Sequence, residues 1–162
     1  MKLNVVKIEN PDLKYQIVVG QGNFAVYTCD DLFRTLLTTV PNIKCAVAMN
    51  EAAPKLVRVT GNDEELKKLA AKNALAIGAS HVFVVVTSNA FPLNILNAIK
   101  MHPAVCNVFV ASANPIEIIV AETELGKAVL GAVDGTAVDR IENEKEKEER
   151  RALVEKLGYK LD

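Results

Sequence analysis

One histidine stands where a helical pattern meets an apolar run that is typical of a buried strand. Ile77-Gly78-Ala79-Ser80-His81 leads directly into Val82-Phe83-Val84-Val85-Val86. An imidazole can carry a proton or accept a phosphoryl group near neutral pH. His81 is therefore a candidate catalytic residue. The alternative is a hydrogen-bonded histidine that only fixes the junction between helix and strand.

Several amides occur in otherwise apolar segments near the ends of predicted elements: Asn73, Asn94, Asn97 and Asn114. A buried amide needs hydrogen-bond partners, so each is a candidate cap or turn former. Taken together beside His81, they predict a polar pocket for a neutral ligand rich in hydrogen-bonding groups. A nucleoside, a sugar or an amide fits that description.

The phosphate-binding motifs of known nucleotide folds are missing or misplaced. Gly20-Gln21-Gly22-Asn23-Phe24-Ala25 fits G-x-G-x-x-A, but a dinucleotide site would need a helix next. The residues 24–28 instead indicate an extended segment, which favours a hairpin or a loop that covers a substrate. No G-x-x-x-x-G-K-[ST] pattern is present, so a P-loop is excluded.

Metal ligation has little support in the sequence, and no resident metal site is predicted. A magnesium ion carried in with a nucleotide needs only one or two protein carboxylates. Glu122 and Asp134 are the candidates for that role. The alternative for each is a solvated turn acid or a capping residue.

The elements that must position these residues follow from hydrophobic periodicity and turn signals. Asp30 or Asp31 is expected to cap a short helix that ends near Pro41, and Asn62, in a capping box with Glu65, to cap the next one. A third helix follows Pro92. We expect strands over 3–8, 15–19, 43–49, 56–60, 81–86, 105–111, 116–121 and 127–133.

The last predicted element is a highly charged helix over about 141–158, docked through Leu153, Val154 and Leu157. With no internal repeat and no linker, residues 1–162 are expected to form one domain. Strands mixed with helices at this spacing predict the α/β class. The architecture would be a single-domain layered sandwich with a mixed, partly antiparallel sheet and flanking helices.

Composition excludes several functional classes. The chain has 162 residues, 50% of them hydrophobic and 24% charged, which suits a globular domain with a sizeable core. A net charge of −1 and only 5% aromatic residues argue against nucleic acid or an anionic membrane as a partner. No apolar run is long enough to span a bilayer, and the first residues start no signal peptide. Three well-separated cysteines indicate buried thiols, so a cytoplasmic location is expected.

Three ordered blocks of the chain resemble a known family. The first is Gly61-Asn62-Asp63 followed by the segment from Asn73 to Phe83, and the second runs from Ala90 to Lys100. The third combines Ala113-Asn114-Pro115-Ile116-Glu117 with the segments 120–124 and 131–135. Together they resemble the adenosine-specific kinase family of archaea and bacteria, over about residues 10–159.

The resemblance implies a compact α/β domain that assembles into a homotrimer or a multiple of it. It also implies binding of adenosine, AMP or ATP, phosphoryl transfer from ATP, and a stable phosphohistidine. By position, His81 would accept the phosphoryl group, and Glu122 and Asp134 would act as base or metal-side carboxylates. The implied ligand-binding residues, counting the pocket amides, are Asn73, Asn94, Asn97, Asn114, Lys55, Arg58 and Gly135.

One position departs from the family pattern. Relatives often carry histidine in the glycine-rich segment where this chain has Asn23. If that position held the phosphoryl group, His81 would only orient the substrate or fix the fold. A non-catalytic adenine-nucleotide sensor is therefore the second hypothesis that the sequence supports.

Overall fold

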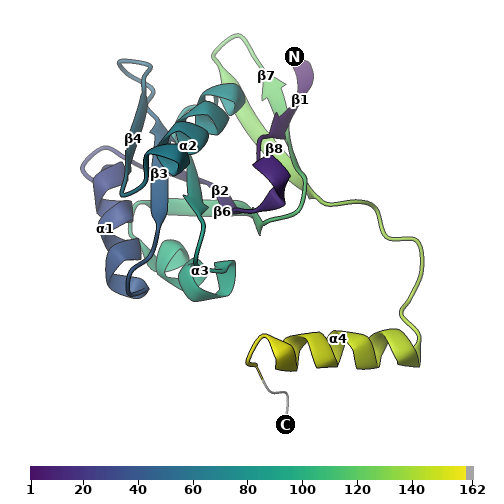
Figure 1. The fold of residues 1–162 in the computed structure, drawn as a ribbon. Helices are drawn as coiled ribbons and strands as arrows, with labels where there is room; N and C mark the ends of the chain where they lie inside the picture. Colours follow the sequence, from purple (N-terminus) through teal and green to yellow (C-terminus); the bar gives the residue numbers. More distant parts are fainter. Residues whose placement is uncertain (160–162) are drawn as a thin grey trace.

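The computed structural model describes residues 1–159 and confirms the α/β sandwich expected from the sequence. The described part of the chain contains a three-residue 3-10 turn, four α-helices and eight strands (Figure 1). The strands are β1 (Lys2–Ile8), β2 (Gln16–Gly22), β3 (Cys45–Asn50), β4 (Val57–Gly61), β5 (Val82–Thr87), β6 (Val105–Ser112), β7 (Ile116–Glu122) and β8 (Lys127–Asp134). The helices are α1 (Cys29–Thr39), α2 (Glu64–Ile77), α3 (Pro92–Met101) and α4 (Glu144–Lys156), and the 3-10 turn is η1 (Pro11–Leu13).

The strands form two sheets. The larger sheet has the order β4-β3-β5-β2-β6, and the smaller has the order β1-β7-β8. Every pairing in both sheets is antiparallel, which refines the expectation of a mixed sheet. The helices α1, α2 and α3 connect β2 to β3, β4 to β5 and β5 to β6, and each of these connections crosses one intervening strand that runs in the opposite direction.

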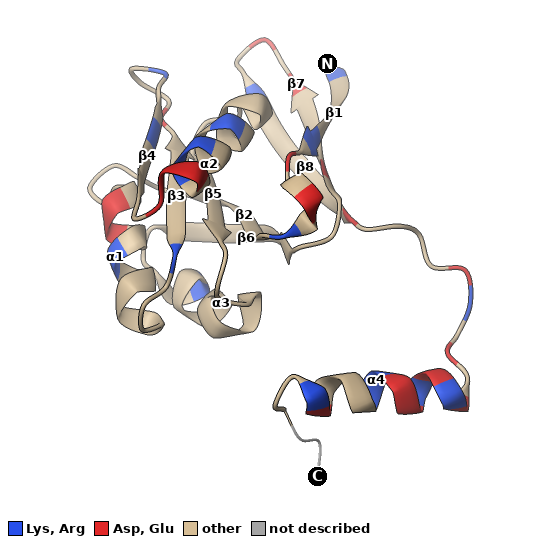
Figure 2. Ribbon diagram, in the orientation of Figure 1, with Lys and Arg blue, Asp and Glu red and all other residues tan. Residues whose placement is uncertain are grey.

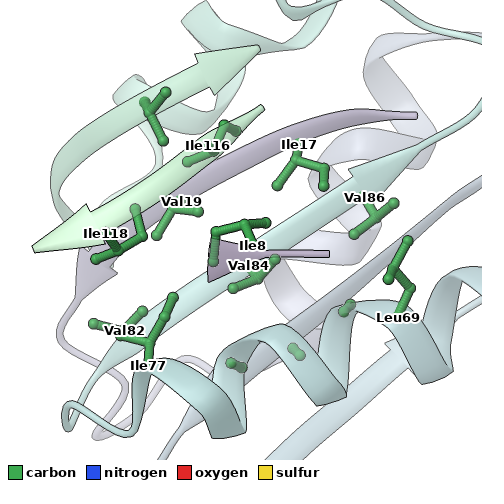
Figure 3. Close-up of a cluster of buried hydrophobic side chains, with 14 of the residues drawn as sticks. Ile8, Ile17, Val19, Leu69, Ile77, Val82, Val84, Val86, Ile116 and Ile118 are labelled. Atoms are coloured by element: carbon green, nitrogen blue, oxygen red, sulfur yellow. The ribbon is translucent and has the colours of Figure 1, made fainter. Parts of the chain in front are cut away.

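Two hydrophobic cores cover the two faces of the five-stranded sheet. One core lies between that sheet, α2 and the inner face of the three-stranded sheet (Figure 3). The other lies between the same sheet and the helices α1 and α3. Val82, Val84 and Val86 of β5 enter the first core, whereas Phe83 and Val85 enter the second. A strand covered on both faces is continuously apolar, as the sequence of β5 indicated.

The helix caps differ from those expected by one to three residues. Thr28, not Asp30 or Asp31, is the N-cap of α1, and Asp31 completes its capping box. Asp63, not Asn62, caps α2 by accepting hydrogen bonds from two backbone N–H groups. Asn62 is used elsewhere, because its amide bonds the backbone of Cys45 and of Ile43. Ser, Thr, Asn and Asp compete for a cap, and tertiary contacts decide among neighbours.

Two further expectations are wrong. Residues 23–27 form a loop rather than an extended strand, and the next helix begins only at Cys29. The charged C-terminal helix exists as α4, but it does not dock on the rest of residues 1–159. None of its residues is buried, and it lies away from the body at the end of an extended segment (Figure 1). Among the described residues, no helix is long and apolar enough to cross a membrane.

Candidate functional site

His81 occupies an unusual backbone conformation at one edge of the five-stranded sheet. Its φ angle is +61°, in the left-handed region that non-glycine residues seldom adopt. Its N–H donates to the backbone oxygen of Asn50 at 2.7 Å, and its carbonyl accepts from the N–H of Gly22 at 2.9 Å. The strained conformation is therefore fixed from both sides. Such conformations concentrate at functional sites. We call this end of the sheet, formed by Gly22, Asn50 and His81, the His81 edge.

A cleft of about 740 Å³ opens at the His81 edge. This volume lies in the range of sites that hold small molecules and cofactors. The cleft joins the end of β3, the C-terminal end of α2 and the turn between β7 and β8. Its lining residues are Asn50, Glu51, Ala52, Lys55, Leu56, Val57, Leu75, Gly78, Ser80, Glu122, Leu125, Gly126 and Lys127. The structure thus places two predicted residues, Lys55 and Glu122, in one cleft, with His81 next to its lining residue Ser80.

Two lysine ammonium groups face this cleft without a carboxylate partner. Within residues 1–159, neither Lys55 nor Lys127 takes part in an ion pair. Lys127 lies over the C-terminal turn of α2, where a Cβ on Gly78 would stand 3.3 Å from its Nζ. Gly78 itself has φ +65° and ends the helix. The negative end of the helix dipole favours a cation there.

The two carboxylates of the cleft, those of Glu51 and Glu122, differ in how firmly their neighbours hold them. Glu51 accepts a hydrogen bond from Nε of Arg58 at 2.9 Å, so Arg58 reaches the rim of the cleft through this ion pair. Glu122 is exposed and accepts a long hydrogen bond of 3.4 Å from the amide of Asn4. Glu122 is thus free to accept a further proton or hydrogen bond from a ligand.

Asn50 is buried at the floor of the cleft, with 6% of its surface exposed. Its Nδ2 donates to the carbonyls of Ala74 and Ala79 at 2.8 and 2.9 Å, which ties the end of α2 to the start of β5. Its Oδ1 has no hydrogen-bond partner among the described residues. A buried acceptor left unpaired is costly, and such atoms often await a ligand or a water molecule.

A second group of predicted residues lies at the other end of the paired strands β7 and β8. Asn114 donates through Nδ2 to Oδ1 of Asp134 at 3.0 Å, and Gly135 follows in a left-handed turn. Asp134 pairs with Ile116 at one end of β7, whereas Glu122 forms the other end. Six residue steps along a strand span about 20 Å. Within a single chain, Asp134 therefore lies far from both Glu122 and His81.

The remaining amides are also distant from His81. Asn94 accepts a hydrogen bond from the N–H of Phe91 at 2.9 Å and so caps α3, which begins beyond the far end of β5. Asn97 is exposed on the same helix. Asn73 is buried and bonds both the N–H and the carbonyl of Glu9, at 2.8 and 2.9 Å. The expectation of four amides around His81 is not met.

The other histidine and two of the cysteines are structural groups. Nδ1 of His102 accepts the N–H of Ala104 at 3.1 Å, and burial lowers the pKa of this histidine, so it stays neutral. Burial raises the pKa of Cys29 to about 11 and that of Cys45 to about 12. Their thiols are therefore inert near neutral pH. Among the described residues, no three metal-ligating side chains cluster.

Sequence reasoning did not find Lys127, Ser80 or Asn50. Lys127 opens a strand next to a turn, which is an ordinary place for a solvated lysine. Its approach to the end of α2 depends on how the two sheets pack. A signal did exist for Asn50, because it is a polar residue at the end of the apolar run of 45–49. Such a residue is a candidate for a strand end that faces a ligand.

The fold and this edge define an α/β protein with a cation-bearing cleft suited to an anionic small molecule. The family model described as adenosine specific kinase matches residues 6–160, and the chain belongs to this family. The crystal structure of the PH1918 protein from Pyrococcus horikoshii OT3 is similar, with 58% sequence identity and a TM-score of 0.94. The match covers 99% of each chain. None of the curated proteins compared with the chain matches it.

Proposed function

We propose that the protein binds adenosine and adenine nucleotides in the cleft at the His81 edge and transfers a phosphoryl group from ATP to adenosine. One observation carries this proposal. A cleft of about 740 Å³ is lined by two lysines without an ion-pair partner, Lys55 and Lys127, and by Ser80, which directly precedes the strained backbone of His81. Membership of the adenosine-specific kinase family supports the nature of the ligand.

The cations suit the phosphate chain of a nucleotide. Phosphoryl transfer depends mainly on positioning and on stabilising the charge of the phosphate oxygens. Lys55 and Lys127 stand on different walls of the cleft, one in the loop after β3 and the other at the start of β8. A phosphate chain between them would receive charge-assisted hydrogen bonds from both. Arg58 would join them when its pairing with Glu51 opens.

The transfer is proposed to run through His81 in two steps. An imidazole nitrogen of His81 attacks the γ-phosphorus of ATP, and the bond to the β–γ bridging oxygen breaks to release ADP. The 5′-hydroxyl oxygen of adenosine then attacks the same phosphorus, and the P–N bond breaks. Glu122 accepts the hydroxyl proton, which leaves AMP and a neutral imidazole. Asn23, which stands where relatives often have histidine, directly follows Gly22, the residue bonded to His81.

A magnesium ion would enter with the nucleotide. Magnesium keeps most of its water and binds proteins through one or two carboxylates plus phosphate oxygens. Glu122 is the exposed carboxylate in the cleft that meets this requirement, and Asp134 lies too far away within the chain. The ion would neutralise charge on the phosphates. The same family resemblance implies a homotrimer, which the mass of the native protein tests.

A nucleotide sensor without catalysis is the second candidate, and one observation favours it. The three residues expected to act in catalysis do not meet within one chain, because Asp134 lies at the other end of β7. A binding module needs only the cleft and its cations. Under this alternative, adenosine, AMP or ATP would bind with no transfer.

Calorimetry with each of these ligands, beside an assay that follows labelled phosphate from ATP to adenosine, separates the candidates. The kinase proposal expects transfer by the wild type and its loss in His81→Gln, with adenosine binding retained. Mass spectrometry of the intact protein after incubation with ATP should show an acid-labile phosphate on His81. Undiminished transfer in His81→Gln would exclude the covalent route, and binding without any transfer would favour the sensor.

A further inference from the structure

The C-terminal part of the described chain, residues 135–159, forms an arm in which no residue is buried. Val138 and Ile141, in its extended segment, are 95% and 91% exposed. Leu153 of α4 and Leu157, its C-cap, are four residues apart and more than half exposed, so they form an apolar stripe on one side of the helix. A helix of this length is marginal in water without a packing partner.

Polar contacts inside the arm fix its shape. Nη1 and Nη2 of Arg140 donate to the carboxylate of Glu146, and Nε and Nη2 of Arg150 donate to the carboxylate of Glu142. Asn143 forms the N-cap of α4 with a reciprocal capping box. These contacts join the extended segment to the helix as one unit. The unit holds α4 away from the body, as Figure 1 shows.

The charges of α4 are balanced. The helix contains five acidic and five basic residues, Glu144, Glu146, Glu148, Glu149 and Glu155 against Lys145, Lys147, Arg150, Arg151 and Lys156. Figure 2 shows both colours mixed along its length. Nucleic acid and anionic membranes select a net positive surface, so neither suits this helix. An apolar protein surface with mixed charges at its rim does.

The outer face of the three-stranded sheet is such a surface, with Lys7 opposite Glu117 near one end of it. Ile116, Ile118 and Val120 of β7 point into the core, so the residues between them face outward. Outward-facing Val5 lies opposite Ile119, and Ile119 lies opposite Gly131. A Cβ on Gly131 would meet no atom within 4 Å, so the space outside this position is open. Leu3, Val5, Leu130 and Val133 are 60, 57, 60 and 42% exposed.

We propose that the arm of one copy packs its Leu153–Leu157 stripe on the outer sheet face of a second copy. Each chain offers one arm and one receiving face, and the arm's extended segment leads away from its own sheet rather than across it (Figure 1). Contacts between two different surfaces of identical chains join copies head to tail. The inference does not depend on the proposed activity.

The first test changes the stripe in the full chain. Leu153→Glu with Leu157→Glu should lower the native molar mass measured by light scattering after size-exclusion chromatography. Arg151→Glu is the matched control, because it makes the same change of two units in net charge on another side of α4, and it should leave the mass unchanged. The thermal transition of the body should persist in all variants, since no residue of α4 is buried. An unchanged mass in the double variant would overturn the proposal.

The second test locates the contact. In a Cys106→Ser background, which removes the exposed native thiol, Val5→Cys and Leu153→Cys chains are co-expressed and treated with a short bismaleimide. The proposal expects a covalent pair of chains on a denaturing gel, and none when Leu153→Cys is replaced by Arg151→Cys. A chain carrying both Val5→Cys and Leu153→Cys that crosslinks only within itself would show docking on its own body. That result, or no crosslink at all, would overturn the proposal.

Discussion

Replacing Asn73 with Leu should destabilise the protein without changing its affinity for nucleotides. The buried amide of Asn73 makes two hydrogen bonds to the backbone of Glu9, 64 positions away in the sequence, at 2.8 and 2.9 Å. They fasten the end of β1 to α2. A hydrogen bond of this kind contributes about 1 kcal/mol net, and leucine leaves both backbone groups of Glu9 without this partner. The free energy of unfolding should therefore fall by about 2 kcal/mol, which corresponds to a decrease of roughly 4–8 °C in Tm.

Lys72→Ala is the matched control for this prediction. Lys72 also contacts Glu9, through an ion pair of 2.8 Å whose two side chains are 65% and 50% exposed. An exposed ion pair contributes about 0–1 kcal/mol, so this variant should change Tm little. Chemical denaturation and calorimetry with ATP measure both properties of each variant. Equal losses of stability in the two variants would refute the energetic argument. Weakened ATP binding by Asn73→Leu at unchanged stability would show that Asn73 belongs to the ligand site.

Three further predictions concern the structural groups. Because burial lowers the pKa of His102 in the folded state, the unfolded chain binds a proton first as the pH falls. Stability should therefore drop below about pH 6.5, by at most about 1.4 kcal/mol per pH unit, and His102→Gln should reduce this slope in denaturation curves. A thiol reagent should label Cys106 alone in the native protein and also Cys29 and Cys45 after unfolding; fast labelling of all three in the folded state would contradict the burial argument. Gly20→Ala should lower the free energy of unfolding by about 1–3 kcal/mol, because the new Cβ would stand 2.3 Å from the ring of Phe83. An unchanged Tm would disprove that clash.

Much of the fold follows from the sequence because the strongest signals are local. The apolar run of 82–86 predicts a strand buried on both faces, and the structure places its side chains alternately in the two cores. The apolar stripe of 66–77 likewise predicts α2. The cap of α2 was misassigned by one residue, because Asn62 and Asp63 have similar capping ability. Asn62 hydrogen-bonds the backbone of Ile43 and Cys45 instead, which leaves Asp63 to cap α2. These contacts join residues far apart in the sequence, so local patterns do not reveal them.

The candidate site was only partly predictable, because a sequence pattern does not say at which end of a sheet a residue lies. Glu122 and Asp134 both stand at strand ends near turns, yet β7 separates them. Asn73 was correctly expected to need partners, but those partners are backbone groups of Glu9 rather than a ligand. Lys127 was missed because its role depends on the packing of the β7–β8 turn against α2.

The prediction that α4 docks on its own chain was wrong for a related reason. Leu153, Val154 and Leu157 predict an apolar surface that needs a partner, but they do not say that the partner belongs to the same chain. In the structure this surface stays exposed, with Leu153 at 57% and Leu157 at 54%. The expectation of a contact survives as the proposal that a second copy supplies it.

The most direct test of the proposed function is the kinetics of phosphate transfer from ATP to adenosine in Lys127→Ala. A hydrogen bond from a charged group contributes about 1.5–3 kcal/mol, so losing one from the phosphate chain should raise KM for ATP by about 10- to 150-fold. Lys100→Ala removes an exposed lysine of α3, away from the cleft, and should behave as wild type. Equal KM values for the two variants, or no transfer by the wild type, would contradict the assignment of this cleft as the site of phosphoryl transfer.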